Sequence, residues 1–218
     1  MKKLFSPDSS ITIFLTKLAD LMIMNLLWLL GCVPVITVGA STTALYRCVM
    51  LYRKDGDIPF VKEFWKAYRV NLKQSTILFL IMIAVGSLVA ADLYVVVYSQ
   101  TEVGIGGMIG FAALALFCLP AMGYVFPLQA QFENSVPQTL KNAWLMSILH
   151  FPKSLVVMIL NLLPLLVLLL WTEVWYRSLL LWFFLGGAAT AYLNGIVLQG
   201  IFRKYISQDK EPDSSATQ

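Results

Sequence analysis

Long apolar runs occupy most of this chain, and only short polar stretches separate them. Five such runs cover residues 18–33, 76–98, 103–128, 155–171 and 179–202. A helix needs about 20 apolar residues to cross the hydrocarbon layer of a bilayer, because each residue advances it by about 1.5 Å. The pattern therefore predicts an all-α polytopic transmembrane helical bundle with five long spans.

A short helix is expected to return toward the membrane interior after the first span. Pro34 cannot donate a hydrogen bond to a helix, and Gly39 permits a tight turn, so the first helix should end there. The next helix, residues 40–53, is half polar and carries Arg47. Such a helix can return through the interior of a bundle as a full or partial span. The sequence thus allows five or six passes.

The positions of the Lys and Arg residues distinguish two topologies. If the break at Pro34 is only a kink, twelve of these cations lie inside and four outside. If residues 18–33 and 40–53 form a hairpin, fifteen lie inside and only Arg177 lies outside. Because Lys and Arg are retained on the cytoplasmic side of membrane spans, we predict the hairpin. Both termini are then cytoplasmic, and the protein lies in the cell membrane.

The membrane part is expected to be a single domain, residues 1–206. Hydrophobic residues make up 59% of the chain and charged residues 13%, against about 25% charged residues in soluble domains. No block is left for a separate soluble domain, and the polar cytoplasmic tail, residues 207–218, is expected to be disordered. Helices are expected over residues 10–33, 40–53, 59–98, 103–132, 137–171 and 178–204.

The cytoplasmic end of the second long span has an amphipathic pattern. Its ring and aliphatic side chains recur every fourth residue, with cations between them: Phe60, Phe64, Tyr68 and Leu72, then Lys62, Lys66, Arg69 and Lys73. This pattern suits a helix at the lipid headgroups, and it also suits a docking surface for a partner. A second polar segment lies between Pro127 and Pro152. The candidate cytoplasmic interaction face comprises Phe64, Trp65, Tyr68, Asn71, Lys73, Glu133, Asn134 and Lys141.

Some polar residues and glycines lie within the expected spans. Asn25 and Asn161 should bridge helices, since an amide in hydrocarbon needs a hydrogen-bond partner. Asp92 could pair with Arg177, or it could act as an intramembrane functional acid. Gly106 and Gly110 are spaced for close helix contact. The candidate helix-break and packing motif comprises Asn25, Trp28, Pro34, Thr37 and Gly39.

A short echo links two parts of the chain. Phe64, Ala67, Tyr68 and Asn71 have the same spacing as Leu140, Ala143, Trp144 and Ser147. Each set follows a helix that arrives at the cytoplasm and a short polar turn. Internal repeats of this kind are common in membrane transport proteins.

No pattern in the sequence is typical of an enzyme. The chain lacks GxSxG, HExxH and Walker A motifs, it has one histidine, and its three cysteines are far apart. We therefore expect no catalysis, no cofactor and no metal site. The net charge of +4 reflects cations beside membrane spans rather than a nucleic-acid surface. The expected partner is the lipid bilayer.

Three blocks of sequence carry a family resemblance. They are Asn25-Leu26-Leu27-Trp28 with Pro34-Val35-Ile36-Thr37-Val38-Gly39, then Phe64-Trp65 with Asn71-Leu72-Lys73-Gln74, and then Tyr124-Val125-Phe126-Pro127 with Phe132-Glu133-Asn134 and Lys141-Asn142-Ala143. Together they resemble the YesL family of bacterial integral membrane proteins, classed as a domain of unknown function, over nearly the whole chain to about Arg203.

The resemblance implies a non-enzymatic accessory of a carbohydrate uptake system of the ABC type in Gram-positive bacteria. The partners would then be subunits of such an importer, since the chain itself has no ATPase motif. The resemblance brings no catalytic or ligand-binding residues. The alternative is a small solute transporter or channel acting on its own, which Asp92, the break at Pro34 and the echo favour.

Overall fold

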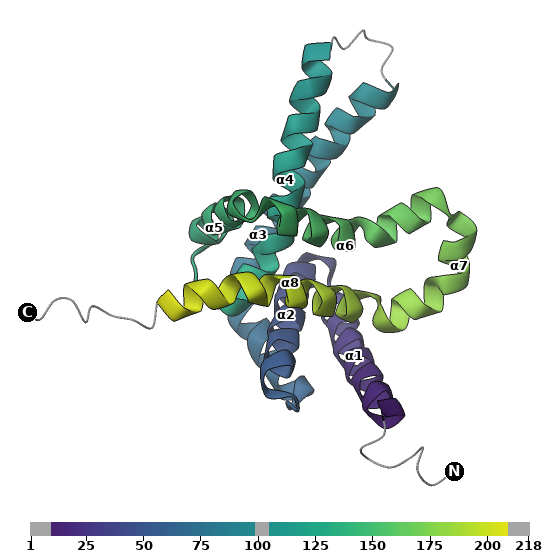
Figure 1. Ribbon diagram of the computed structural model, residues 1–218, viewed down its shortest axis with the longest axis vertical. Helices are drawn as coiled ribbons and strands as arrows, with labels where there is room; N and C mark the ends of the chain where they lie inside the picture. The colour runs from purple at the N-terminus through teal and green to yellow at the C-terminus, as the bar shows by residue number, and fades with distance from the viewer. Residues whose placement is uncertain (1–9, 99–104, 209–218) are drawn as a thin grey trace, which may run out of the picture.

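The computed structural model describes residues 10–98 and 105–208, and within these ranges every regular element is helical (Figure 1). The elements are α1 (Ser10–Cys32), the short 3-10 helix η1 (Val35–Thr37), α2 (Val38–Asp55), α3 (Phe60–Tyr98), α4 (Ile105–Gln131), α5 (Val136–Leu149), α6 (Phe151–Leu170), α7 (Thr172–Leu181), the π-helical turn η2 (Trp182–Gly186) and α8 (Gly187–Gln208). Six segments of the described chain are long and apolar enough to cross a membrane. The prediction of an all-α polytopic membrane protein is confirmed.

The returning helix, α2, lies at the centre of the protein. It contacts α1, α3, α4 and α8, and its residues between Gly39 and Met50 are mostly buried. Its polar side chains find partners inside the protein. The hydroxyl groups of Thr43 and Ser75, for example, lie 2.9 Å apart between α2 and α3, and both residues are fully buried. A half-polar helix is stable here because neighbouring helices shield it from lipid.

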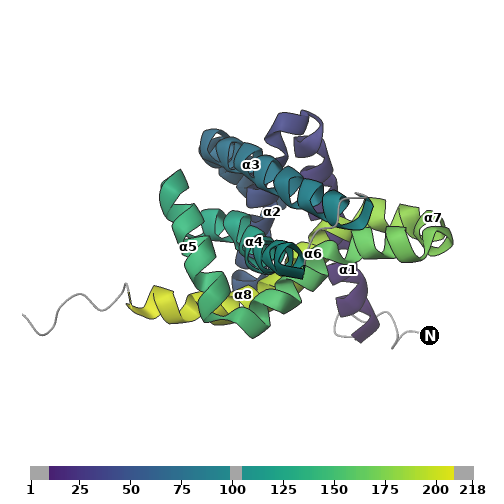
Figure 2. The same cartoon turned by 90° about the horizontal axis from the view of Figure 1, so that it is seen from above.

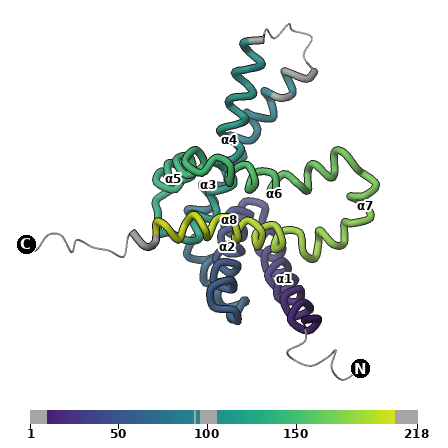
Figure 3. Tube along the Cα trace, in the orientation of Figure 1, coloured from purple at the N-terminus to yellow at the C-terminus, as the bar shows by residue number. Residues whose placement is uncertain are grey.

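Two helical arms project from this centre in different directions (Figures 1 and 2). The outer parts of α3 and α4 form the first arm, and α6, α7 and α8 form the second. The chain runs out along α6, turns at α7 and returns along α8 (Figure 3). Large apolar side chains are exposed along both arms, among them Leu80, Leu88, Leu114, Leu165 and Leu169. Lipid tails are as apolar as leucine, so they can cover these surfaces without penalty.

A glycine makes the turn between α2 and α3 possible. Gly56 has a φ angle of 83°, a conformation that residues with a side chain rarely adopt. Its backbone N–H donates to the carbonyl of Tyr52 at 2.9 Å and closes the end of α2. This turn places the start of α3 beside the last turns of α2, so the two helices pack as a hairpin.

The helix expected over residues 137–171 is divided into α5 and α6. The division falls at His150, whose φ and ψ angles of −117° and 38° are not helical. Pro152 follows in the first turn of α6. Proline has no backbone N–H and clashes with the preceding turn of a helix, so it is tolerated at a helix start and ends a helix that comes before it. In the sequence echo, α3 has Thr76 at the position of Pro152, and α3 continues without a break.

The last helical region begins earlier than expected. Helix α7 starts at Thr172 rather than near residue 178, and it passes through the π-helical turn into α8. Ser207 and Gln208, which we expected in the tail, extend α8. Residues 209–218, the remainder of the predicted disordered tail, lie outside the described residues.

Candidate functional site

The predicted break after α1 is built by hydrogen bonds from Thr37. Its hydroxyl donates to the carbonyl of Pro34 at 2.7 Å and to that of Gly31 at 3.0 Å. The hydroxyl of Ser41 donates to the carbonyl of Trp28 at 2.6 Å. The last carbonyls of a helix lack helical partners, and the Thr37 hydroxyl satisfies one of those of α1, that of Gly31. The break is therefore a defined corner.

Gly39 allows α2 to approach α3 at this corner. A Cβ atom at position 39 would collide with the backbone carbonyl oxygen of Ser75 and lie 2.7 Å from the Cβ of Phe79. Only glycine fits between the two helices, as in other close helix contacts within membranes. Gly106 and Gly110 differ, because a Cβ at either position would meet nothing within 4 Å.

Asn25 joins α1 to the π-helical turn before α8. Its amide N–H donates to the carbonyl of Phe183 at 2.7 Å, and its Oδ1 accepts the backbone N–H of Ala188 at 2.9 Å. Residues five apart bond to each other directly in a π-helix. Here Phe183 and Ala188 are five apart, and the side chain of Asn25 on α1 bonds to both. Asn25 therefore bridges two helices, as predicted from its place in an apolar run.

A polar centre lies where α2, α6 and α8 meet. The amide of Asn194 is fully buried and donates to the hydroxyl of Tyr46 and to Oδ1 of Asn161, each at 3.0 Å. Asn161 in turn donates to the carbonyl of Val157 at 2.9 Å. The Oδ1 atom of Asn194 is buried and has no hydrogen-bond partner. Three helices from both halves of the chain thus share one uncharged network.

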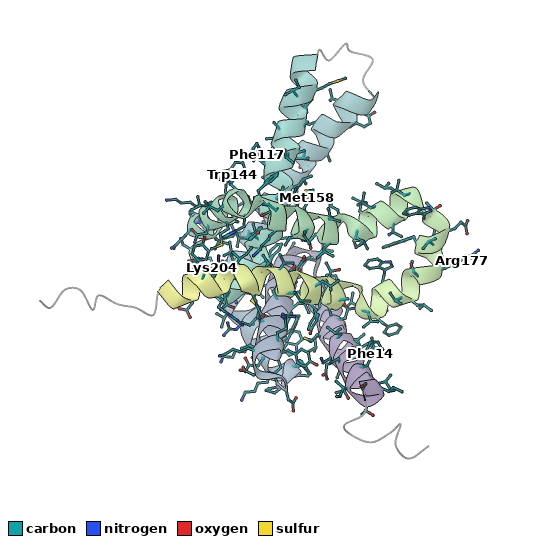
Figure 4. All side chains as sticks on the ribbon, in the orientation of Figure 1. Phe14, Phe117, Trp144, Met158, Arg177 and Lys204 are labelled. Atoms are coloured by element: carbon teal, nitrogen blue, oxygen red, sulfur yellow. The ribbon has the colours of Figure 1, made fainter. Side chains whose placement is uncertain are left out.

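Two cavities adjoin this polar centre. The first has a volume of about 350 Å³ and lies between α2 and the second arm, and the second, of about 310 Å³, lies between α2, α4 and α6. Both are lined by Thr42, Tyr46 and Asn161. Three tryptophans, Trp28, Trp175 and Trp182, line the first cavity. Met158, labelled on α6 in Figure 4, lines the second. Ligand pockets have volumes of about 300–1,000 Å³, so each cavity is large enough for a small molecule.

Sequence reasoning missed most of this centre. Thr42 and Tyr46 are four residues apart and therefore lie on one face of α2. That spacing, on a helix too polar to face lipid, is the local signal that could have found them. Asn194 could have been found in a similar way, because it is an amide side chain within the apolar run of residues 179–202.

A second polar cluster ties α3, α4 and α5 at the predicted cytoplasmic end. Gln129 is 4% exposed; its amide N–H donates to Gln74 at 2.6 Å and to Asn71 at 3.3 Å. Its Oε1 accepts the hydroxyl of Thr139 at 2.7 Å. Arg47 donates to the carbonyl of Ala130 at 3.4 Å, where a cation complements the negative end of the α4 dipole.

The predicted interaction face is only partly exposed. Phe64 and Tyr68 are buried in the core, and Trp65 is half-buried against it. Their spacing of four residues places both side chains on the face of α3 that packs on α2, and not on a face that contacts headgroups or a partner. The cations of the same helix are on the surface, together with hydrophobic side chains: Lys62, Lys66, Arg69 and Lys73, with Val61 and Val70.

The remaining residues of that face lie near the start of α5. Glu133 and Lys141 are exposed, whereas Asn71 and Asn134 are half-buried. The Nδ2 atom of Asn134 is buried without a hydrogen-bond partner. We name the surface that remains the cationic ridge and define it as Lys62, Lys66, Arg69, Lys73, Val61 and Val70.

Asp92 belongs to α3 and Arg177 to α7, which lie on different arms (Figure 1), and no ion pair joins these two residues. Asp92 is half-buried near the outer end of α3. Asp20, by contrast, accepts a hydrogen bond from the hydroxyl of Tyr52 at 2.8 Å, which links α1 to α2. In the described part of the chain, no three His, Cys, Asp or Glu side chains are grouped to hold a metal ion.

His150 lies at the break between α5 and α6, outside the spanning segments. Its Nε2 is 3.4 Å from the hydroxyl of Tyr205 on α8. Partial burial, and then the nearby cations of Lys153 and Lys204, lower the pKa of the imidazole. The neutral form is therefore favoured at this junction.

Comparison with known proteins gives one match. Residues 21–93, about a third of the chain, match the model of a family described as a protein of unknown function, DUF624. This region holds about half of α1, all of α2 and most of α3, including the corner at Pro34 and the close contact at Gly39. No curated protein and no solved structure matches the chain.

Proposed function

We propose that this multi-pass membrane protein is a non-enzymatic accessory of a carbohydrate uptake system of the ABC type in Gram-positive bacteria, as the resemblance to the YesL family implies. The observation that carries the proposal is the cationic ridge. Its side chains are exposed, while Phe64 and Tyr68 of the same helix are buried in the core. A charged and partly apolar surface is suited to binding a partner of complementary charge.

The order of elements supports a docking role for this surface. The ridge lies at the start of α3, soon after the turn at Gly56. Phe64 and Tyr68 of the same part of α3 are packed in the core and fix its position. The chain has no nucleotide-binding motif. Energy for uptake would therefore come from another subunit, and the ridge is where such a subunit would dock.

Site-specific photo-crosslinking at native expression levels tests this role. A photoreactive amino acid at Val70, which is 76% exposed on the ridge, should crosslink to another protein. The matched control is Leu169, which is 68% exposed on the second arm and is expected to face lipid. We expect importer subunits in the products from position 70 and only lipid from position 169. Repeated recovery of the chain alone from both positions would reject an accessory role.

The second candidate is a small solute transporter or channel that acts alone. The specific observation in its favour is the pair of cavities that share Thr42, Tyr46 and Asn161. Polar residues at the contact between helices are typical of solute paths in transporters. Flux of a solute into liposomes that contain only this chain would support this role, and the lack of flux under any sugar or ion gradient would argue against it.

A further inference from the structure

The two cavities at the polar centre have no ionisable lining apart from the phenol of Tyr46. Neither is lined by Asp, Glu, Lys, Arg or His. A charged molecule would lose its hydration there without gaining a counter-ion, which costs several kcal/mol for each ion. The occupant that fits is therefore uncharged.

The first cavity is lined by hydrogen-bond donors that have no acceptor in the described chain. The hydroxyl of Tyr46, which is 5% exposed, accepts from Asn194 but donates to no described residue. Trp175 and Trp182 also line the cavity, and in the described chain their indole N–H groups donate to no residue. Two of the lining side-chain oxygens are engaged: the hydroxyl of Thr42 accepts from Trp28 at 3.2 Å and donates to Val38 at 2.8 Å, and Oδ1 of Asn161 accepts from Asn194 at 3.0 Å.

The aromatic wall adds a second restriction. The rings of Trp175 and Trp182 lie 5.6 Å apart at an angle of 31°, and both belong to the second arm. Such ring faces favour a flat, apolar partner. Together with the unused donors, they favour a molecule that combines an apolar face with acceptor oxygens.

We propose that the cavities around Tyr46 bind a small uncharged molecule of mainly apolar surface that presents hydrogen-bond acceptors, such as ketone, ester or ether oxygens. Tyr46 is the principal donor, because it lines both cavities and is held in place by Asn194. This inference goes beyond the accessory role. It concerns the binding of a ligand and does not depend on transport of that ligand.

Photolabelling with benzophenone tests the proposal on the full chain in alkyl maltoside micelles. Benzophenone is an uncharged aromatic ketone, and its insertion sites can be mapped by mass spectrometry. We expect labelling of cavity-lining peptides from α2, α6 or α8. Acetophenone and ethylbenzene serve as competitors, because they have nearly the same shape and differ in the carbonyl. Acetophenone should compete about fivefold better, as expected for one net hydrogen bond.

A variant of Tyr46 and a matched control identify the donor. Tyr46→Phe removes one hydroxyl and should reduce the acetophenone preference to nearly none. Tyr124→Phe is the matched control, because Tyr124 is also buried, bonds to Ser154 at 2.9 Å and lines neither cavity. Trp182→Phe provides a second test if Tyr46→Phe does not fold, and it should weaken the same preference.

Three results would overturn the proposal. They are equal competition by the two compounds in the wild-type chain, label confined to lipid-facing peptides, and equal loss in Tyr46→Phe and Tyr124→Phe. The readout does not depend on protein crosslinks or on flux. Failure here is therefore distinguishable from failure of either proposed function.

Discussion

Asn25 accepts the backbone N–H of Ala188 at 2.9 Å, although the two residues are 163 positions apart in the sequence. The same side chain donates to Phe183 at 2.7 Å. A side-chain amide thus completes the backbone hydrogen bonding of the π-helical turn, at the point where α8 begins its return. The first and last helices of the described chain are joined at this point.

Replacement of Asn25 should therefore destabilise the protein. Asn25→Leu leaves the carbonyl of Phe183 and the N–H of Ala188 without these partners, at about 1–3 kcal/mol for each buried group. We expect a lower unfolding temperature in detergent. Leu26→Ala is the control, since Leu26 is 39% exposed and faces outward from the same helix. Equal stability of the two variants would show that the bridge to α8 is not formed.

The close contact at Gly39 predicts a large effect from a single methyl group. Gly39→Ala would push α2 away from the Ser75 carbonyl on α3, and overpacking of this kind costs about 1–3 kcal/mol. Gly106→Ala should have little effect, because no atom outside the local helix backbone lies within 4 Å of the added Cβ. Thermal unfolding of both variants in the same detergent checks this. A neutral Gly39→Ala would mean that α2 and α3 are farther apart than described.

Gln129 should be essential for the order of the junction between α4 and α5. Gln129→Leu keeps the approximate volume but removes the hydrogen bonds to Gln74, Asn71 and Thr139. We expect faster proteolysis between α4 and α5, because α5 loses its polar link to α4. Gln138→Leu is the control, since Gln138 is exposed on the first turn of α5. Unchanged cleavage in Gln129→Leu would show that apolar packing alone holds α5.

Acidification should loosen the junction between α5 and α6. The pKa of His150 is lowered in the folded protein, so the unfolded state binds more protons once the pH falls below the usual histidine value, and stability then decreases. The unfolding temperature should therefore fall as the pH is lowered from about 7.5 to about 5.5. His150→Gln should remove part of that dependence. An identical pH dependence in the variant would assign it to other groups.

The sequence predicted the spans well for a physical reason. Bilayer thickness fixes the length of an apolar run, so α1, α3 and α4 could be read directly from the pattern. The corner at Pro34 was equally readable, because proline and glycine act on the local backbone. The break at His150 was missed because an apolar run continues across Pro152, although that proline was visible.

Side-chain environments were harder to predict than helices. The spacing of four residues between Phe64 and Tyr68 is expected both for a helix that packs on a protein core and for one that lies on lipid headgroups. Only the position of α2 distinguishes the two. The contact between Tyr46 and Asn194 joins residues 148 positions apart, and no local pattern encodes such a contact. The polar centre therefore became visible only with the tertiary structure.

The most direct test of the account is the side of the membrane on which each turn lies. In a chain whose native cysteines are replaced by alanine, three exposed positions serve as probes: Asp57→Cys, Ser135→Cys and Arg177→Cys. With a membrane-impermeant maleimide, Arg177→Cys should react in intact cells, and the other two should react only after permeabilisation. Reaction of Asp57→Cys in intact cells would contradict the hairpin of α1 and α2, and with it the cytoplasmic place of the cationic ridge.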